Sequence, residues 1–277
     1  MMNFPMTNIS LSRFCLLLLA TLLAACETLS QDYDPTKDWS AAKLHSEAKA
    51  ELQDGNFEKA AKLYEALESR YPYGAYSQQA QLEQIYVYYK QHETASAISE
   101  ADRFIKAHPN HPGVDYAYYM KGLANFNDDL GLFGIYSPSD LAERDMKPTR
   151  ESFDAFKELV TRFPNSRYAE DATLRMKYLV DVMAHADLAT ARYYFRRHAY
   201  LAAANRAQQV LKLFPRTSST EEALYIMAKS YEAMGLHDLQ KDSLRVLQRD
   251  YPNSKFLASA SASQAKGSGH PWWRLFW

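Results

Sequence analysis

The chain has 277 residues and nearly balanced charge, with 32 Lys plus Arg against 33 Asp plus Glu and a formal net charge of −1. This balance lacks the basic excess of nucleic-acid-binding proteins, so we expect no nucleic-acid partner. Glycine is scarce at 9 residues, and alanine-rich stretches of good helix formers are frequent, which favours an all-α protein.

The amino-terminal residues have the pattern of an export signal. Arg13 precedes an apolar run from Phe14 to Ala25, and a positive charge followed by roughly 7–15 apolar residues is typical of a secretory signal peptide. The run is shorter than the about 20 residues that a membrane-spanning helix needs. We therefore predict that residues 1–25 form a signal peptide that is removed.

The sequence LAAC at residues 23–26 ends this run and resembles the bacterial lipobox. It predicts cleavage before Cys26 and a covalent lipid on the Cys26 thiol; an ordinary signal peptide followed by a chance cysteine is the alternative. Cys15, the other cysteine, lies in the leader, so no thiol is left for a disulfide or a metal site. Lipoprotein maturation adds more than one acyl chain, which gives durable attachment where a single chain is marginal.

Glu27 follows the predicted lipidated cysteine. In the lipoproteins that this leader resembles, Asp at that position favours retention in the inner membrane, so Glu27 favours the outer membrane. Residues 26–39 are polar and interrupted by Pro35, and we expect them to form a lipidated tether.

A proline recurs at the end of each of several predicted helices. Because proline cannot continue a helix, each one marks a stop followed by a turn. The prolines are Pro72, Pro109, Pro164, Pro215 and Pro252, spaced by 37, 55, 51 and 37 residues. A period in the mid-thirties with helix-turn-helix content is typical of a helical solenoid. The sequence therefore predicts an α-solenoid of about five helix pairs.

The unit that ends at the first of these prolines resembles the second half of a tetratricopeptide repeat. Gly55 is expected to form the turn between two helices, and Phe57 to pack into that turn. Ala60 is small where the two helices approach, while Tyr64 and Leu67 continue the same face. The other units are expected to use Ala97, Ala101, Phe104, Phe156, Leu159, Tyr200, Ala203, Ala207, Val210, Gly235, Leu244 and Leu247. Two units are degenerate, because Ser152 and Gln240 take the alanine position.

Three stretches depart from the repeat. Residues 127–147 are expected to be an insertion loop inside the third unit, between repeat regions 40–126 and 148–258. A loop of that length is often functional, and a plain surface insertion is the alternative. The periodicity of residues 168–184 predicts an unusually long helix before the fourth unit. Residues 259–277 are rich in Ser, Ala and Gly and end in aromatic residues, which predicts a flexible tail with an aromatic end.

Signatures of catalysis are missing from the sequence: it contains no nucleophile elbow, dinucleotide loop, P-loop or His-Glu-x-x-His motif. We therefore predict a protein that is not an enzyme, with no cofactor beyond the lipid on Cys26. His108 and His111 lie on either side of Pro109 in a predicted turn, and we expect no metal site there. A hydrolase with an unrecognised site is an alternative, which shifted carboxylates or histidines in a groove would indicate.

Taken together, the lipobox and the repeats resemble the BamD (ComL) family of lipoproteins that assemble outer-membrane β-barrels. The most specific segments are LQDGN at 52–56, RYPYG at 70–74 and YSQQ at 76–79. The resemblance implies a non-enzymatic protein, anchored in the outer membrane and facing the periplasm. Its implied partners are the periplasmic domains of BamA and unfolded barrel precursors, with BamC and BamE as further partners in some bacteria. A periplasmic repeat lipoprotein that scaffolds cell-wall enzymes is the alternative, which the RYPYG segment disfavours.

Precursor recognition is assigned by this resemblance to the amino-terminal repeats. Tyrosine offers apolar area and a polar handle at low entropy cost, which suits aromatic, alternating peptides. The candidate binding residues are Tyr71, Tyr73, Tyr76, Gln78, Gln79, Tyr86, Tyr88 and Tyr89. For two or three of these tyrosines, repeat core is the alternative role.

BamA docking is assigned by the resemblance to the carboxy-terminal repeats. The candidate docking patch in the fourth unit is the run YYFRR at residues 193–197, from which Tyr194, Arg196 and Arg197 are chosen as the docking residues. Arginine and tyrosine are enriched at protein interfaces. A solvated helix face is the alternative.

Overall fold

The computed structural model describes residues 34–126 and 145–257. The predicted leader, Cys26, most of the insertion loop and the predicted tail lie outside these ranges. Within them, regular structure consists of ten helices and no strand. The helices are α2 (Ala41–Gln53), α3 (Phe57–Arg70), α4 (Ala75–Lys90), α5 (Thr94–Ala107), α6 (Val114–Asn125), α8 (Lys147–Arg162), α9 (Ala169–Arg196), α10 (Tyr200–Leu213), α11 (Ser219–Ala233) and α12 (His237–Asp250).

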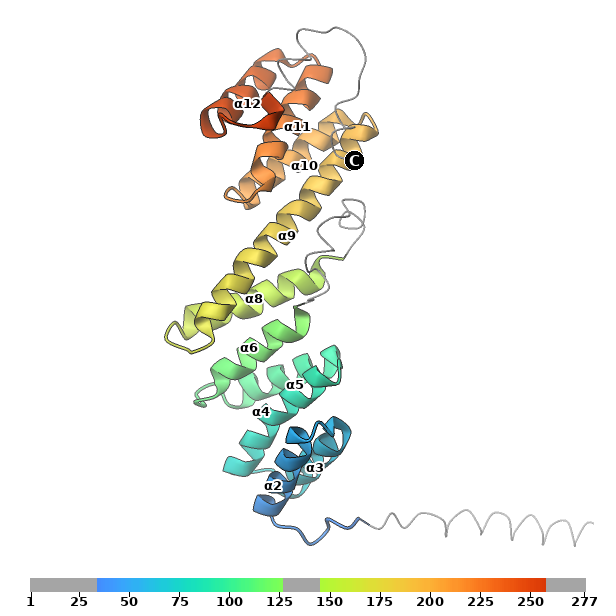
Figure 1. The fold of residues 1–277 in the computed structure, drawn as a ribbon, viewed down its shortest axis with the longest axis vertical. Helices are drawn as coiled ribbons and strands as arrows, with labels where there is room; N and C mark the ends of the chain where they lie inside the picture. The colour runs from blue at the N-terminus through green and yellow to red at the C-terminus, as the bar shows by residue number, and fades with distance from the viewer. Residues whose placement is uncertain (1–33, 127–144, 258–277) are drawn as a thin grey trace, which may run out of the picture.

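The helices stack as five consecutive pairs along an elongated molecule (Figure 1). The pairs are α2 with α3, α4 with α5, α6 with α8, α9 with α10, and α11 with α12, and each helix packs mainly on its neighbours in sequence. The first helices of successive pairs also touch, as α2 does with α4, α4 with α6, and α9 with α11. The predicted α-solenoid of about five tetratricopeptide-like helix pairs is therefore confirmed.

A left-handed residue closes the turn inside four of the five pairs. Gly55 and Gly235 occupy this position with φ of +80° and +73°, and glycine adopts such angles without steric cost. His92 and His198 occupy it in the second and fourth pairs, with φ of 61° and 62°. The turn predicted at Gly55 is therefore present, and two histidines adopt the same backbone shape in place of glycine.

The prolines act as the sequence predicts. In each case the residue before the proline leaves the helix, because the α conformation is disfavoured there. These five residues have φ between −129° and −134°, and each still donates its amide hydrogen to the carbonyl four residues earlier. The acceptor residues are all fully buried: Leu67, Phe104, Leu159, Val210 and Leu247. The same short sequence pattern, an X-Pro dipeptide, thus ends the second helix of each pair and fixes the position of its last core residue.

The alanine position marks the closest approach of each pair. Ala60, Ala97 and Ala203 are fully buried there. In the third pair Ser152 is also fully buried, and its hydroxyl donates a 2.8 Å hydrogen bond to the carbonyl of Gly122. In the last pair, Gln240 is only half-buried. The degenerate units therefore keep the pairing but not the same packing.

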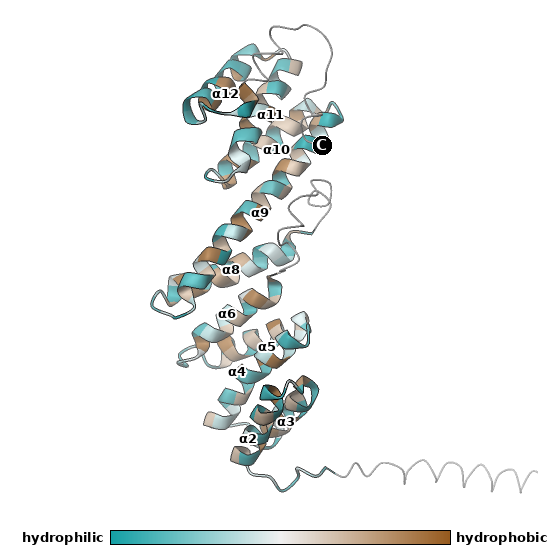
Figure 2. Ribbon diagram, viewed as in Figure 1, coloured by the Kyte–Doolittle hydropathy of each residue, from teal (hydrophilic) through white to brown (hydrophobic). Residues whose placement is uncertain are grey.

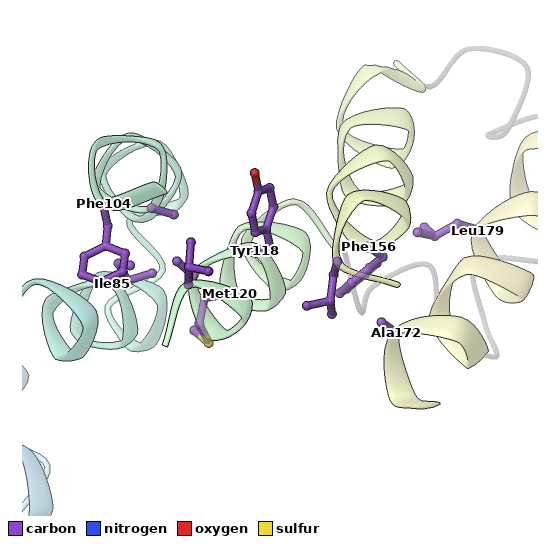
Figure 3. Packing of buried hydrophobic residues seen from close by; sticks show 11 residues of the cluster. Ile85, Phe104, Tyr118, Met120, Phe156, Ala172 and Leu179 are labelled. Atoms are coloured by element: carbon purple, nitrogen blue, oxygen red, sulfur yellow. The ribbon is translucent and has the colours of Figure 1, made fainter. Parts of the chain in front are cut away.

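The buried side chains form successive clusters along the stack rather than one central core. The central cluster joins α4, α5, α6, α8 and α9 through residues such as Phe104, Met120 and Phe156 (Figure 3). Apolar residues alternate with polar ones along each helix, as expected when one stripe faces a neighbour (Figure 2).

The helix predicted over residues 168–184 is longer than expected. It is α9, which has 28 residues and runs on to Arg196, so that one helix links the central cluster to the carboxy-terminal pairs (Figure 1). No helix among the described residues is both long and apolar enough to cross a membrane. The predicted insertion also ends earlier than expected, because Lys147 already belongs to α8.

Candidate peptide-binding and docking surfaces

The turn between α3 and α4 presents three of the predicted tyrosines to solvent. Tyr73 is 91% exposed and lies beside Gly74, whose φ of +104° turns the chain into α4. Tyr71 is 38% exposed, and its hydroxyl donates a 2.9 Å hydrogen bond to the carbonyl of Trp39. Tyr76 follows in the first turn of α4 and is 46% exposed. Gln79, one turn further, is also exposed. We call Tyr71, Tyr73, Tyr76 and Gln79 the turn surface.

Buried polar groups contact the residues of the turn surface and support it. The Tyr76 ring lies 5.6 Å from the ring of buried His45, whose Nε2 is 3.0 Å from Glu83 Oε2. The same oxygen accepts a 2.6 Å hydrogen bond from the Tyr64 hydroxyl, and Oε1 accepts a 3.1 Å bond from Gln79 Nε2. Burial and the Glu83 carboxylate both raise the pKa of Tyr64. Glu83 therefore ties three helices together beneath the exposed rings.

The other predicted residues in α4 lie deeper. Tyr86 and Tyr89 are half-buried and pack against the central cluster. The Tyr88 hydroxyl donates to Glu65 Oε1 at 3.1 Å, and burial together with that carboxylate raises the pKa of Tyr88 to about 12. Gln78 is also half-buried. The eight predicted residues therefore divide into an exposed group at the turn and a partly buried group within the stack.

A second aromatic group, on α6 and at the residue before α9, was not singled out from the sequence. The rings of Tyr119 and Tyr168 stack at 4.6 Å with an interplanar angle of 17°, and Tyr116 lies 5.7 Å from Tyr168. The Tyr119 hydroxyl donates a 2.8 Å hydrogen bond to Asp171, which is paired with Arg175 at 2.6 Å. Burial and the bond to Asp171 raise the pKa of Tyr119 to about 12. The sequence signal that could have revealed this group is the spacing of Tyr116 and Tyr119, three residues apart at the start of α6.

The predicted docking residues lie at the end of α9 and in the turn before α10. Arg196 and Arg197 are exposed, and the Arg197 guanidinium lies 5.4 Å from the centroid of the Tyr193 ring. Tyr194 is half-buried against the carboxy-terminal cluster, whereas Tyr193 is 44% exposed. Neither arginine forms an ion pair within the described ranges. We call Tyr193, Arg196 and Arg197 the docking surface; within the predicted patch of residues 193–197, the exposed ring is Tyr193 rather than Tyr194.

The end of α9 is held rigidly against α11. The Arg192 guanidinium donates two hydrogen bonds to the Glu222 carboxylate, one to each oxygen. Both side chains are mostly buried, and bidentate pairs of this kind fix geometry as well as energy. The docking surface therefore projects from a helix end whose position is set by the fifth repeat.

These features define the class of the protein. Among the described residues, no group of three or more His, Cys, Asp or Glu side chains could hold a metal ion. Repeat solenoids of this kind present extended surfaces to polypeptide partners. The fold and its two surfaces are those of a tetratricopeptide-like scaffold.

The chain belongs to a particular family of such scaffolds, the YfiO outer membrane lipoproteins, whose model matches residues 37–247. It is 43% identical to the outer membrane protein assembly factor BamD of Neisseria meningitidis serogroup A, over 94% of this chain and 96% of that protein. It is 39% identical to BamD of Vibrio cholerae, over 84% of this chain and 95% of that protein. A solved structure of a Thermus thermophilus TPR protein is similar over 82% of this chain and 99% of that one, with 15% identity and a TM-score of 0.35. The predicted membership in the BamD family is confirmed.

Proposed function

We propose that this protein is a non-enzymatic scaffold in outer membrane protein assembly, anchored by lipid on Cys26 and facing the periplasm. Relatives named as assembly factors match it over nearly their full length, which supports the role. The observation that carries the mechanism is the turn surface, where Tyr73 and Tyr76 stand exposed above a buried network centred on Glu83.

The turn surface is suited to aromatic segments of unfolded barrel precursors. Exposed rings stack on incoming aromatic side chains and gain affinity beyond the area they bury. Gln79 adds an amide that can pair with a peptide backbone. Because the Glu83 network fixes Gln79 and the helix beneath Tyr76, little conformational entropy is lost on binding. Tyr86, Tyr88 and Tyr89 contribute less in this proposal, since they are packed or hydrogen bonded within the stack.

The docking surface is suited to an acidic patch on a folded partner. Two guanidinium groups beside an exposed tyrosine ring match the enrichment of Arg and Tyr at interfaces. We assign this surface to the periplasmic domains of BamA, with BamC and BamE as further partners. Because α9 is held by the Arg192–Glu222 pair, the surface is preformed.

Two variants, each measured in the same two assays, test the two assignments. The first readout is fluorescence anisotropy of a labelled peptide that alternates phenylalanine and glutamine. The second is copurification of BamA from mild detergent. The variant Tyr73→Ala with Tyr76→Ala should weaken peptide binding about tenfold, since removing two stacked rings costs on the order of 1–3 kcal/mol. It should leave BamA copurification unchanged.

The variant Arg196→Glu with Arg197→Glu should show the opposite pattern and reduce BamA copurification alone. Both variants change exposed residues, so each should keep the parent unfolding midpoint. Loss of both activities in either variant, or of neither, would show that the two surfaces are wrongly assigned.

A further inference from the structure

The last stretch of the tether, residues 34–39, is fastened to the end of α3, and we call it the clipped segment. The Arg70 guanidinium donates hydrogen bonds to the Asp34 carboxylate and to the main-chain carbonyl of Thr36. It donates a third, at 3.0 Å, to the Thr36 hydroxyl. The Arg70 side chain is mostly buried, and hydrogen bonds of a charged donor are stronger than neutral ones. One guanidinium therefore holds two residues of the tether.

The clipped segment is also ordered within itself and at its other end. The Asp34 carboxylate accepts hydrogen bonds of 2.8 Å and 2.6 Å from the main-chain N–H and the hydroxyl of Thr36, which closes a local turn. The Tyr71 hydroxyl donates to the carbonyl of Trp39. The Trp39 side chain packs against the apolar cluster of the first repeat, with Lys43 Nζ 4.3 Å from its ring centroid. Both ends of the segment are therefore bound to the first repeat.

The clip fixes the point at which the tether leaves the fold. Asp34 is eight residues after Cys26, and an extended chain spans at most about 3.6 Å per residue, so Asp34 lies within about 29 Å of the cysteine. Without the clip, the first fixed residue would be Ser40, the N-cap of α2, which is fourteen residues from Cys26 and within about 50 Å of it. The clip therefore shortens the maximum reach of the tether by about two fifths.

This exit point lies beside the turn surface. Arg70 directly precedes Tyr71, and Tyr71 is itself a member of the turn surface that holds the clipped segment. Both residues lie at the α2–α3 end of the stack, whereas the docking surface lies further along it, at the end of α9 (Figure 1). An anchor on the tether would therefore act first on the position of the turn surface.

We propose that Arg70 is a positioning residue, which clips the tether and thereby holds the turn surface close to the lipid surface that carries the anchor. This inference rests on the proposed function, because it takes the lipid on Cys26 and the peptide-binding turn surface as given. A precursor segment bound at Tyr73 and Tyr76 is then held near the membrane that receives it. The clip sets this distance without touching the peptide.

Limited trypsin digestion of the full-length lipoprotein in mild detergent tests the clip itself. Lys37 lies inside the clipped segment, so cleavage after it requires the segment to open. Arg70→Gln should raise the rate of this cleavage about tenfold, as expected when hydrogen bonds to a charged group are lost. Asp34→Ala with Thr36→Ala breaks the clip from the tether side and should raise the rate several-fold, since the carbonyl of residue 36 remains. Arg249→Gln removes the same charge at the end of α12 and should leave the rate unchanged.

Vesicles that contain an acceptor-labelled lipid test the position of the turn surface. Tyr73→Cys supplies a single labelling site, because Cys15 leaves with the leader and Cys26 carries lipid in the proposed function. Energy transfer from a donor at this site should be lower in Arg70→Gln, since six more residues then separate the anchor from the first fixed residue. That change lengthens the r.m.s. span of a flexible chain by about a third. Insertion of eight Gly and Ser residues after Glu27 should also lower the transfer, although the clip stays intact.

The outcomes separate the clip from the proposed function. Equal cleavage after Lys37 in the parent and in a folded Arg70→Gln protein would overturn the clip. Faster cleavage with unchanged energy transfer would overturn the positioning role. Peptide affinity should keep its parent value in the Asp34→Ala with Thr36→Ala protein, because no residue of the turn surface is changed. A protein that does not float with the vesicles would contradict the lipid anchor, and this inference with it. A turn surface that binds no peptide would contradict the proposed function alone and leave the cleavage and energy-transfer results unaffected.

Discussion

The Tyr64 hydroxyl donates a 2.6 Å hydrogen bond to Glu83, which joins the second helix of the first repeat to the first helix of the second. His45 of α2 lies 3.0 Å from the same carboxylate oxygen. Three helices thus meet at one carboxylate directly beneath Tyr76. The stability of the first two repeats and the shape of the turn surface should therefore depend on the same group.

Replacing Glu83 by Gln tests this dependence. The change keeps the size of the side chain but removes the charge that Tyr64, His45 and Gln79 share. We expect a loss of about 1.5–3 kcal/mol in the free energy of unfolding, the range for hydrogen bonds to charged groups. Urea unfolding measures it, with Glu47→Gln on exposed α2 surface as the control. Tyr64→Phe combined with Glu83→Gln should be less than additive, and strict additivity would show that the bond contributes nothing.

The left-handed turn residues provide a second prediction. His92 has φ of 61°, a conformation that costs a non-glycine residue about 1–2 kcal/mol. His92→Gly should therefore raise the free energy of unfolding, by about 0.5–1 kcal/mol once the greater freedom of glycine in the unfolded chain is subtracted. Gly55→Ala, at the same position of the first pair, should lower it by a similar amount. Chemical unfolding of both variants checks the signs, and destabilisation by His92→Gly would contradict this account.

The sequence predicted the repeat positions well because their causes are local. Proline disfavours the helical conformation at the preceding residue, so the five helix ends could be placed from Pro72, Pro109, Pro164, Pro215 and Pro252. The left-handed turn at His92 could not be placed in the same way, since histidine in a sequence does not indicate a positive φ. The length of α9 was underestimated, although no proline or glycine interrupts residues 169–196.

The roles of individual tyrosines in α4 were harder to predict for a geometric reason. This helix packs against α2, α3, α5 and α6, and its buried positions include polar residues such as Ser77, Gln81 and Gln84 as well as apolar ones. Periodicity therefore could not separate exposed Tyr76 from half-buried Tyr86 and Tyr89.

Close packing in the third pair gives a third prediction. A Cβ atom built on Gly122 would lie 2.4 Å from Phe156 Cε1, and Phe156 is fully buried. Gly122→Ala should therefore force α6 and α8 apart and cost about 1–3 kcal/mol, the usual range for overpacking. Ser152→Ala should cost about 1 kcal/mol, because it removes only the hydrogen bond to the Gly122 carbonyl. Thermal and urea unfolding compare the two, and a Gly122→Ala protein as stable as the parent would contradict the packing described here.

The pH dependence of stability should reveal His185 at the junction of α9 and α11. Burial lowers the pKa of His185 below 6.5, and the Arg192 guanidinium lowers it further, against the opposing carboxylates of Asp181 and Glu222. The folded state therefore favours the neutral ring, whose Nε2 lies 3.1 Å from the Ser218 hydroxyl.

A depressed histidine pKa stabilises the fold above the unfolded value of 6.5, and this contribution is lost as the pH falls through the lower folded-state value. His185→Gln should accordingly flatten the loss of stability between about pH 8 and 5. Urea unfolding across that range measures the slope, with His237→Gln on the exposed face of α12 as the control. A slope that is unchanged in His185→Gln, or flattened equally in the control, would mean that other groups set the acid sensitivity of the carboxy-terminal repeats.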